Sequence, residues 1–491
     1  MSLFRTKPVE QSISDTIDIE EGGHRLHREL SALDLTVFGI GVIVGTGIFV
    51  LTGVAARENA GPAVALSFVA AGIVCALAAL CYAEMASSVP VAGSAYTFSY
   101  STIGEFPAWV IGWDLILELA LAAAVVSVGW SGYAKSLLDS AGLHLSPKIA
   151  GEDADFNIPA MLIVLVVTTL LVLGIKISSR VNAIIVTIKI AVVLLVIVAG
   201  LFFIKGENYS PFIPPAQATP EVAGAKAPLI QVLFGITPVN FGWLGVFSAA
   251  AVVFFAFIGF DIVATAAEET RNPQRDLPIG IISSLAICTT LYVAVSLVVV
   301  GMQNYKDLSA EAPLADAFKA VGHPAFATII SIGALAGLTT VVLILILGQT
   351  RVFFAMSRDR LMPPWLSAVH PRFGTPYRVT IILGVIVAIA AALIPLSALA
   401  ELVNIGTLFA FIVVSIGVIV LRRTHPDLPR PFRTPLVPVL PILSVLACLY
   451  LMLNLPVETW LRFLVWMVIG CAVYFLYGKR HSRLEGAPSR R

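Results

Sequence analysis

The stretch Gly41-Val42-Ile43-Val44-Gly45-Thr46-Gly47-Ile48-Phe49 interrupts an apolar span that begins near Leu33. A second span, which begins near Leu244, is interrupted in the same way by Phe257-Ile258-Gly259-Phe260-Asp261. Backbone that leaves a helix inside a membrane has unpaired N–H and C=O groups, so it persists only where it lines a polar cavity or is covered by protein. The two interruptions therefore predict a polar site buried among membrane helices.

The composition indicates a membrane protein. Of 491 residues, 58% are hydrophobic and 12% are charged, and the mean hydropathy is +0.93. These values are far more apolar than those of an ordinary soluble domain. The first thirty residues are polar and lack the apolar region of a signal peptide, so we expect them to be retained. The five cysteines all lie in apolar runs, which predicts packing as small hydrophobic residues rather than disulfide pairing.

The distribution of positive charge predicts the orientation. A transmembrane helix needs about 20 apolar residues, and twelve runs of that kind can be counted. With the N-terminus inside, 22 of the 31 Lys and Arg residues lie in inner segments and eight in outer ones, as the positive-inside rule requires. We therefore expect an all-α polytopic protein of the plasma (inner) membrane with 12 transmembrane helices and both termini cytoplasmic. The predicted spans are 33–56, 62–87, 106–134, 158–175, 182–204, 244–268, 278–302, 325–353, 378–395, 398–421, 438–456 and 460–478.

Two five-helix units of nearly equal length are expected, and each begins with its interrupted span. Because each unit has an odd number of spans, the second crosses the membrane in the opposite sense, which predicts a 5+5 inverted repeat typical of secondary transporters. The predicted divisions are a cytoplasmic N-terminal segment (1–32), a first repeat (33–204, spans one to five), an extracellular linker (205–243), a second repeat (244–421, spans six to ten), spans eleven and twelve (422–478) and a cytoplasmic tail (479–491).

The polarity of the two breaks favours a zwitterionic ligand. In span one, the helix that restarts near Thr46 and Gly47 directs N–H groups and a positive dipole end toward mid-membrane, where a carboxylate would bind. Span six runs from outside to inside, so its first half ends near Phe257 with carbonyl groups at the same depth, where an ammonium would bind. A free amino acid carries both groups. The alternative is that the glycines only permit close helix packing.

Ionisable residues inside apolar spans are costly and often functional. Lys189 lies in an otherwise apolar run and can gain and lose a proton or occupy the place of a sodium ion; the alternative is a structural lysine that is permanently paired. Asp114 and Glu118 share one helical face, and Glu118, the deeper, is a candidate proton carrier. Asp261 stands at the break of span six, where it either caps the restarted helix or carries a proton.

Several motifs together resemble one known superfamily, named for amino acids, polyamines and organocations (APC). Over about residues 30–480 the chain is similar to bacterial members of its cationic amino acid transporter family. One departure is Arg360, because the family often has Gly after Ser-Arg-Asp. The motifs are the Gly41–Phe49 run, Tyr82-Ala83-Glu84 with Pro90, Gly93 and Tyr96, the segment from Glu268 to Pro278, Gln349-Thr350-Arg351, and Ala355-Met356-Ser357-Arg358-Asp359.

The resemblance implies a fold of ten helices in two inverted repeats plus two more, with proton-coupled, sodium-independent uptake by alternating access. It also implies roles for individual residues. The carboxylate-binding turn corresponds to Ile43, Gly45, Thr46 and Gly47. The ammonium-binding carbonyls correspond to Phe255, Ala256 and Ile258, with Phe255 as an aromatic gate, and part of the side-chain pocket corresponds to Gly337, Leu338 and Thr339. The proton-coupling positions correspond to Lys189, Glu118 and Asp261.

The sequence therefore predicts a secondary active transporter of L-amino acids. The segments beside the breaks supply mainly Phe, Ile, Leu, Thr and Gly, which favours small neutral substrates such as alanine, with cationic ones as a second possibility. An exchanger of the same fold is the main alternative, and an intramembrane enzyme that uses Asp114 with Glu118 or Asp261 is a remote one. No cofactor, metal or nucleic acid is expected. The expected partners are an amino acid, protons and membrane lipid, and the sequence does not specify an accessory subunit.

Overall fold

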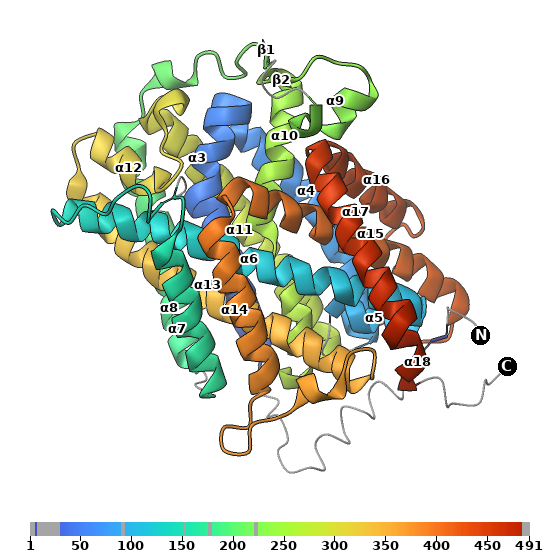
Figure 1. Ribbon diagram of the computed structural model, residues 1–491. Helices are drawn as coiled ribbons and strands as arrows, with labels where there is room; N and C mark the ends of the chain where they lie inside the picture. The colour runs from blue at the N-terminus through green and yellow to red at the C-terminus, as the bar shows by residue number, and fades with distance from the viewer. Residues whose placement is uncertain are drawn as a thin grey trace.

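The computed structural model describes residues 5–6, 30–89, 94–151, 154–174, 179–219 and 224–483. These residues form a helical bundle, with one small antiparallel sheet of β1 (Gln217–Ala218) and β2 (Val239–Asn240) at one end (Figure 1). Most of the predicted N-terminal segment, the last part of the predicted tail, and Pro90, Gly93 and Lys176 lie outside the described residues. The five cysteines are free thiols, as the sequence predicts.

Eight helical stretches among the described residues are long and apolar enough to cross a membrane, and four further apolar helices are shorter. Together they overlap the twelve predicted spans, while the number of crossings stays a prediction. The long stretches contain α4 (Val64–Ser88), α6 (Glu105–Ser140), α8 (Ser179–Gly200), α10 (Gly242–Val253), α11 (Pro273–Met302), α13 (Pro324–Arg358), α15 (Leu396–Thr424) and α17 (Val457–Val473), and the shorter helices are α2 (Ala32–Ile43), α7 (Ile158–Val172), α14 (Tyr377–Leu393) and α16 (Val439–Leu453).

Short helical turns connect and extend these elements. The short α-helices are α3 (Thr52–Ala55), α5 (Ser94–Thr102), α9 (Leu229–Leu233), α12 (Pro313–Ala320) and α18 (Lys479–His481). The π-helical turns are η1 (Gly47–Leu51), η2 (Ala56–Ala60) and η12 (Tyr474–Gly478). The 3₁₀ turns are η3 (Gly61–Ala63), η4 (Leu201–Phe203), η5 (Gly206–Tyr209), η7 (Gly224–Lys226), η8 (Phe254–Phe257), η9 (Asp261–Glu269), η10 (Tyr305–Asp307) and η11 (Pro364–Ser367).

Both predicted helix interruptions are present. Helix α2 starts with a capping box, in which the Ser31 hydroxyl accepts the Asp34 N–H and the Asp34 carboxylate accepts the Ser31 N–H. It ends at Ile43, and the helix resumes at Gly47 as a π turn. Helix α10 tightens into η8 and ends before Gly259, whose φ of +123° only glycine adopts readily. Glycine therefore allows the sharp change of direction in the second broken helix.

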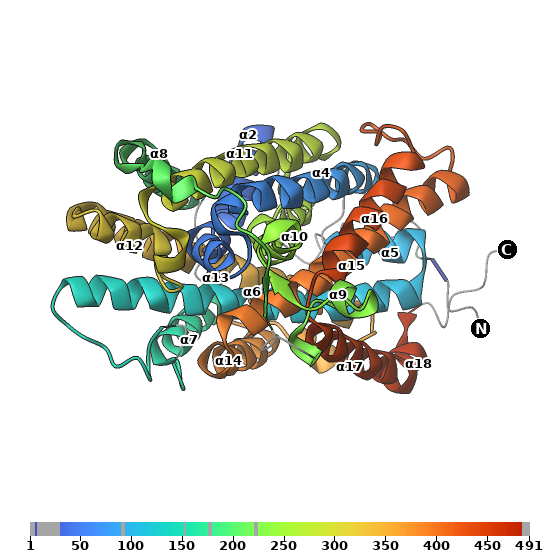
Figure 2. The same ribbon diagram turned by 90° about the horizontal axis from the view of Figure 1, so that it is seen from above.

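Corresponding helices of the two predicted units pack on each other. Helix α4 packs against α11, α6 against α13, and α7 against α14, which are the second, third and fourth helices of each unit. Helices α8 and α17 lie toward the outside of the bundle, while α10 and α13 lie near its centre (Figure 2). The interrupted helices are thus enclosed by the other helices of both units.

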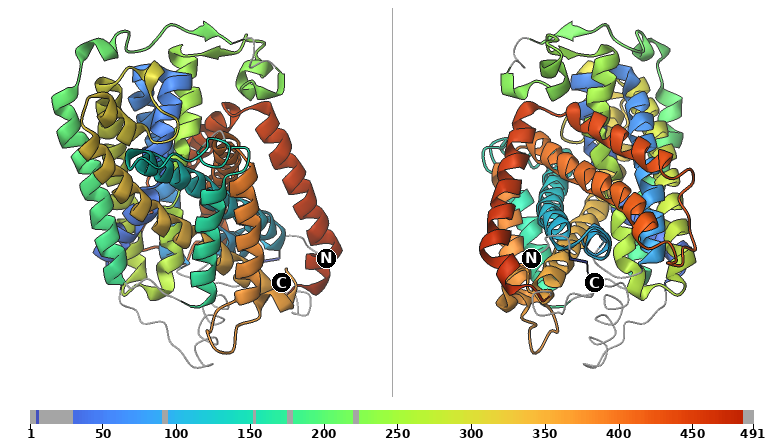
Figure 3. Two further views of the ribbon diagram at one scale, coloured as in Figure 1. Left: turned by 60° about the vertical axis from the view of Figure 1, so that its left-hand side comes forward. Right: turned by 90° about the vertical axis from the view of Figure 1, so that its right-hand side faces the viewer.

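The described residues nearest to the two ends of the chain meet at Glu105. The Glu105 N–H donates to the Arg5 carbonyl (2.8 Å), and the Ser482 hydroxyl donates to the Glu105 carboxylate (2.6 Å). Helix α18, close to the end of the described chain, lies at the opposite end of the bundle from β1 and β2 (Figure 3). The described residues nearest to the two ends are therefore held on one side of the bundle, which is what an even number of spans predicts.

Arg360 occupies a backbone conformation that glycine favours. Its φ is 60°, in the left-handed region, and it lies two residues after Arg358, where α13 ends. A non-glycine residue in this region is strained by roughly 1–2 kcal/mol. The loop after α13 therefore keeps the turn that a glycine would form, and Arg360 bears the strain.

Candidate functional site

A small cavity lies between the two helix interruptions. It is lined by backbone and side chains from both breaks, together with α6 and α13, and the space open to the centre of a water molecule is about 20 Å³. That is enough room for about one water molecule, so an amino acid can bind only if the lining moves outward. The lining residues are Val42, Ile43, Gly45, Thr46, Gly47, Ala122, Val126, Phe255, Ile258, Val341 and Leu345.

The two interruptions touch each other directly. A Cβ atom built on Gly47 would lie 2.2 Å from the Ala256 Cα, and one built on Gly259 would lie 2.7 Å from the Val42 side chain. Such separations are far shorter than any real contact, so glycine is sterically required at both positions. Gly45 differs, because the atoms nearest to its built Cβ are 3.6 Å away, on Val341. Close packing thus explains Gly47 and Gly259 but not Gly45.

The span-one break offers hydrogen-bond donors without partners. The Thr46 hydroxyl is fully buried, and no described residue bonds to it. Likewise, the N–H groups of Gly45 and Thr46 donate no hydrogen bond to any other described residue. A buried polar group without a partner costs about 1–3 kcal/mol. A carboxylate that entered the cavity would accept hydrogen bonds from these donors and remove that cost.

The span-six break contributes an aromatic side chain and carbonyl groups. Phe255 and Ile258 line the cavity, and the Phe255 carbonyl accepts the Ile258 N–H (3.2 Å), which leaves its second lone pair available. Ala256 does not line the cavity, because it packs against Gly47. Of the seven residues predicted at the two breaks, six therefore line the cavity, and the seventh, Ala256, lies behind them.

Lys189 is fully buried and bound to the first break. Its Nζ donates a hydrogen bond of 2.6 Å to the Gly41 carbonyl, in the last turn of α2. No described carboxylate forms an ion pair with it. The partial negative charge at the end of a helix favours a cation, and the lysine stem packs against Gly337, where a Cβ would lie 2.8 Å from it. Lys189 of α8 thus places its amine against the backbone of α2, next to residues that line the cavity.

The buried acids form a separate group. Glu118, Asp114 and Asp261 are all nearly inaccessible to solvent, and the other two carboxyl groups lie close enough to Glu118 to affect it electrostatically. Asp261 Oδ1 accepts the N–H of Gly259 (3.2 Å) and so pairs a backbone group of the second break. Neither Glu118 oxygen accepts a hydrogen bond of good geometry within the described part of the chain. Asp261 is therefore tied to the backbone, whereas the proton-carrying role of Glu118 stays a prediction.

The predicted side-chain pocket lies one turn away from the cavity. Gly337 packs on Lys189, Leu338 is buried in α13, and the Thr339 hydroxyl accepts a hydrogen bond from the Trp130 indole (3.1 Å). None of the three lines the cavity, whereas Val341 and Leu345 do. The spacing of 337, 341 and 345 is that of one helical face, so the sequence indicates the face but not the turn that meets the cavity.

Two lining residues of α6 were also missed. Ala122 and Val126 line the cavity, and they follow Glu118 at intervals of four residues. The predicted proton carrier therefore shares a helix face with the cavity wall. The same periodicity could have identified them from the sequence.

Contacts close the bundle on both sides of the cavity. Toward the predicted outer side, Lys135 forms an ion pair of 2.7 Å with Glu311. Toward the predicted inner side, Leu30 exchanges backbone hydrogen bonds with Glu269 (3.0 Å) and Arg271 (2.9 Å). Glu269 also pairs with Arg351 (3.3 Å). The cavity is thus small, and contacts join the surrounding segments at both ends of the bundle.

Comparisons with known proteins identify the family. A family model described as amino acid permease matches residues 30–480. The chain belongs to the amino acid permease family. The predicted membership of the APC superfamily, with cationic amino acid transporters among the relatives, is thereby confirmed. The permease is a multi-pass membrane transporter and not an enzyme.

Three relatives show how far the similarity extends. The branched-chain amino acid permease BcaP of Bacillus subtilis (strain 168) is 50% identical over 492 residues, which is 99% of both chains. The methylthioribose transporter of the same organism is 48% identical over 489 residues, also 99% of both. Cationic amino acid transporter 4, vacuolar, of Arabidopsis thaliana is 38% identical over 432 residues, which is 87% of this chain and 68% of the relative.

Proposed function

We propose that this permease takes up small or medium neutral L-amino acids, such as alanine, by proton-coupled, sodium-independent alternating access. The observation that carries the proposal is the cavity between the two touching breaks. Its unpaired donors at Gly45 and Thr46 suit a carboxylate, and the carbonyls near Phe255 suit an ammonium. A zwitterion supplies both groups.

The walls of the cavity support a neutral side chain. Apart from Thr46, its lining side chains are aliphatic or aromatic, and no charged side chain of the described residues is among them. A guanidinium or ammonium side chain would be desolvated there without a counter-charge, at a large cost. The name of the branched-chain permease relative, which is 50% identical, also points to neutral substrates.

Lys189 supports the proton coupling and the independence from sodium. Its ammonium binds the Gly41 carbonyl at the end of α2, where a cation is favoured, so it takes a place that a metal ion would otherwise fill. Glu118, on the same helix face as Ala122 and Val126, supports a second proton-binding position close to the cavity wall.

The packing of α4 on α11, α6 on α13 and α7 on α14 supports a 5+5 inverted repeat with twelve crossings. The excess of Lys and Arg in the segments predicted to be inside supports cytoplasmic termini and a location in the plasma membrane. The divisions of the chain predicted from the sequence follow from this topology.

Uptake into proteoliposomes tests the proposal. Labelled alanine should accumulate under an inward proton gradient without sodium, and a protonophore should abolish the accumulation. Unlabelled alanine and valine should compete, while arginine and lysine should not. Competition by arginine and lysine alone would overturn the substrate assignment, and a requirement for sodium would overturn the coupling. Methylthioribose belongs in the panel because a relative is named for it.

Symport and exchange are separated by the contents of the vesicles. We expect gradient-driven uptake into vesicles that contain no amino acid. Uptake that occurs only when the vesicles are preloaded with substrate would establish the exchanger instead.

A further inference from the structure

A second, larger cavity lies on the surface of the bundle. It is a groove of about 490 Å³ between the first half of α11 and the segment that joins α15 to α16. Arg275, Pro278, Ile279, Ile282 and Ala286 lie along one face of α11, and Phe432 forms the opposite wall. Gln274 and Ser283 also line the groove, and apart from these two and Arg275 its lining side chains are apolar. The groove is therefore long, mostly apolar and basic at a single end.

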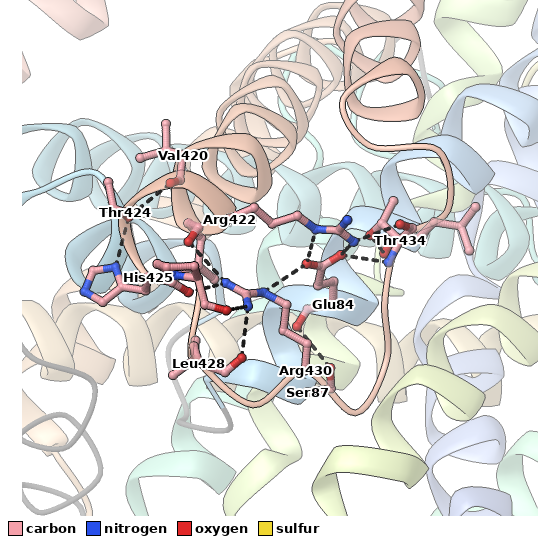
Figure 4. Close-up of polar contacts among 12 residues, drawn as sticks. Glu84, Ser87, Val420, Arg422, Thr424, His425, Leu428, Arg430 and Thr434 are labelled. Atoms are coloured by element: carbon pink, nitrogen blue, oxygen red, sulfur yellow. Dashed lines mark hydrogen bonds and ion pairs between the residues drawn. The ribbon is translucent and has the colours of Figure 1, made fainter.

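The wall that contains Phe432 is held by a buried ion-pair cluster (Figure 4). The fully buried Glu84 carboxylate accepts hydrogen bonds from Arg422 Nε (2.9 Å) and Nη2 (2.7 Å). It also accepts the Thr434 N–H (2.7 Å), and Arg430 Nε lies 3.6 Å from it. The two ends of the segment 430–434 are thus fixed to α4. Phe432 lies between these two anchored residues, so the position of this side of the groove is fixed by contacts with α4.

The positive charge of the groove has no ion-pair partner among the described residues. Arg275 is exposed and forms no ion pair with any described residue, whereas Arg422 and Arg430 are engaged by Glu84. Arg433, which directly follows Phe432, is exposed and forms no ion pair within the described ranges either. No carboxylate of the described side chains lines the groove. Its charge is therefore complementary to an anion, and arginine binds phosphate oxygens well.

The surroundings of the groove are those of a lipid-facing surface. On α11, Ile279 is 42% exposed and Ile287 is 41% exposed. In a membrane protein such side chains contact acyl chains. The predicted topology places Arg275 at the cytoplasmic surface, where anionic lipids are enriched and attract basic residues.

We propose that this groove binds one anionic phospholipid. Its phosphate contacts Arg275, and one acyl chain lies along Ile279, Ile282 and Ala286 against Phe432. The occupant is thereby assigned as a lipid and not as a free anion, an apolar partner helix or a second copy of this chain.

Photo-crosslinking tests the proposal with the full-length protein in phosphatidylcholine vesicles that contain some photoreactive phosphatidylglycerol. The labelled peptides are identified by mass spectrometry, and we expect labelling of α11 and of the segment around Phe432. Arg275→Gln should lower this labelling about fivefold, as expected for one arginine at an anionic surface. Ala286→Trp, which fills the groove without changing charge, should lower it at least as much.

Two matched variants control for charge and bulk. Arg423→Gln removes another exposed, unpaired arginine, and Ile287→Trp adds the same ring beside the groove; both should leave labelling unchanged. Equal labelling by photoreactive phosphatidylcholine, or equal loss in the controls, would overturn the proposal. So would competition by inorganic phosphate, which would indicate a free-anion site. A change of oligomeric state in Ala286→Trp would instead indicate a second copy.

Discussion

Replacing Lys189 by methionine separates a coupling role from a structural one. The substitution keeps an unbranched side chain against Gly337 but removes the ammonium and its 2.6 Å hydrogen bond to the Gly41 carbonyl. A hydrogen bond from a charged group contributes about 1.5–3 kcal/mol, and the buried carbonyl loses this partner. We expect Lys189→Met to lower the free energy of unfolding by about 2 kcal/mol and to abolish alanine accumulation driven by a proton gradient.

Tyr292→Phe is the matched control for this loss. The Tyr292 hydroxyl donates a hydrogen bond of 2.7 Å to the Ile43 carbonyl, two residues further along the same break. Its removal should lower the free energy of unfolding by about 1 kcal/mol and leave gradient-driven uptake unchanged. The measurements are thermal unfolding in detergent and alanine uptake at several external pH values. Full, pH-dependent uptake by Lys189→Met would refute the coupling role. Equal loss of uptake in both variants would show that Lys189 acts only by holding the break.

Further predictions concern the two breaks and the Glu84 cluster. Gly47→Ala should destabilise the protein by about 1–3 kcal/mol through overpacking, whereas Gly45→Ala should leave thermal unfolding unchanged and raise the KM for alanine; equal melting temperatures for the two would contradict this. Thr46→Val removes an unpaired buried hydroxyl, so stability should be unchanged or up to about 1 kcal/mol higher while alanine binding weakens in a calorimetric titration. Glu84→Gln should lower the free energy of unfolding by about 3 kcal/mol because it breaks a buried ion pair. Glu269→Gln, which breaks an exposed pair, should lower it by less than about 1 kcal/mol. Similar unfolding midpoints for both variants would show that the Glu84 cluster does not stabilise the protein.

The positions of the breaks could be predicted because they depend on local chemistry. Glycine within an apolar span, as at Gly45 and Gly259, is a signal that the sequence carries by itself. The direct contact between Gly47 and Ala256 could not be predicted, because it depends on how two segments about 210 residues apart come together. Sequence reasoning therefore placed Ala256 in the site, whereas the three-dimensional packing places it behind the site.

The side-chain pocket shows the same limit on a smaller scale. The face of α13 that meets the cavity includes Val341 and Leu345 rather than the residues around Leu338. A shift of one turn moves a position by about 5.4 Å along the helix, and periodicity fixes the face but not the depth. Arg360 is a contrasting case, since it stands where the family often has glycine and its own backbone adopts the left-handed conformation that glycine favours.

The two breaks are held by ionisable groups of opposite sign. At the first break, the Lys189 ammonium binds a carbonyl, and at the second, the Asp261 carboxylate accepts the Gly259 N–H. The ammonium contacts a carbonyl oxygen and the carboxylate contacts an N–H group, so each interaction is favourable. Loss of either charge therefore weakens the hydrogen bond that fixes the backbone of the corresponding break. Gly259 in turn packs on Val42, which lines the cavity. Under the proposed proton coupling, a change of protonation at Lys189 or Asp261 would therefore act directly on the backbone that binds the substrate. No intervening residues are needed to connect the two events. This arrangement also predicts that the effects of Lys189 and Asp261 substitutions on uptake are not additive, because both act through one pair of touching breaks.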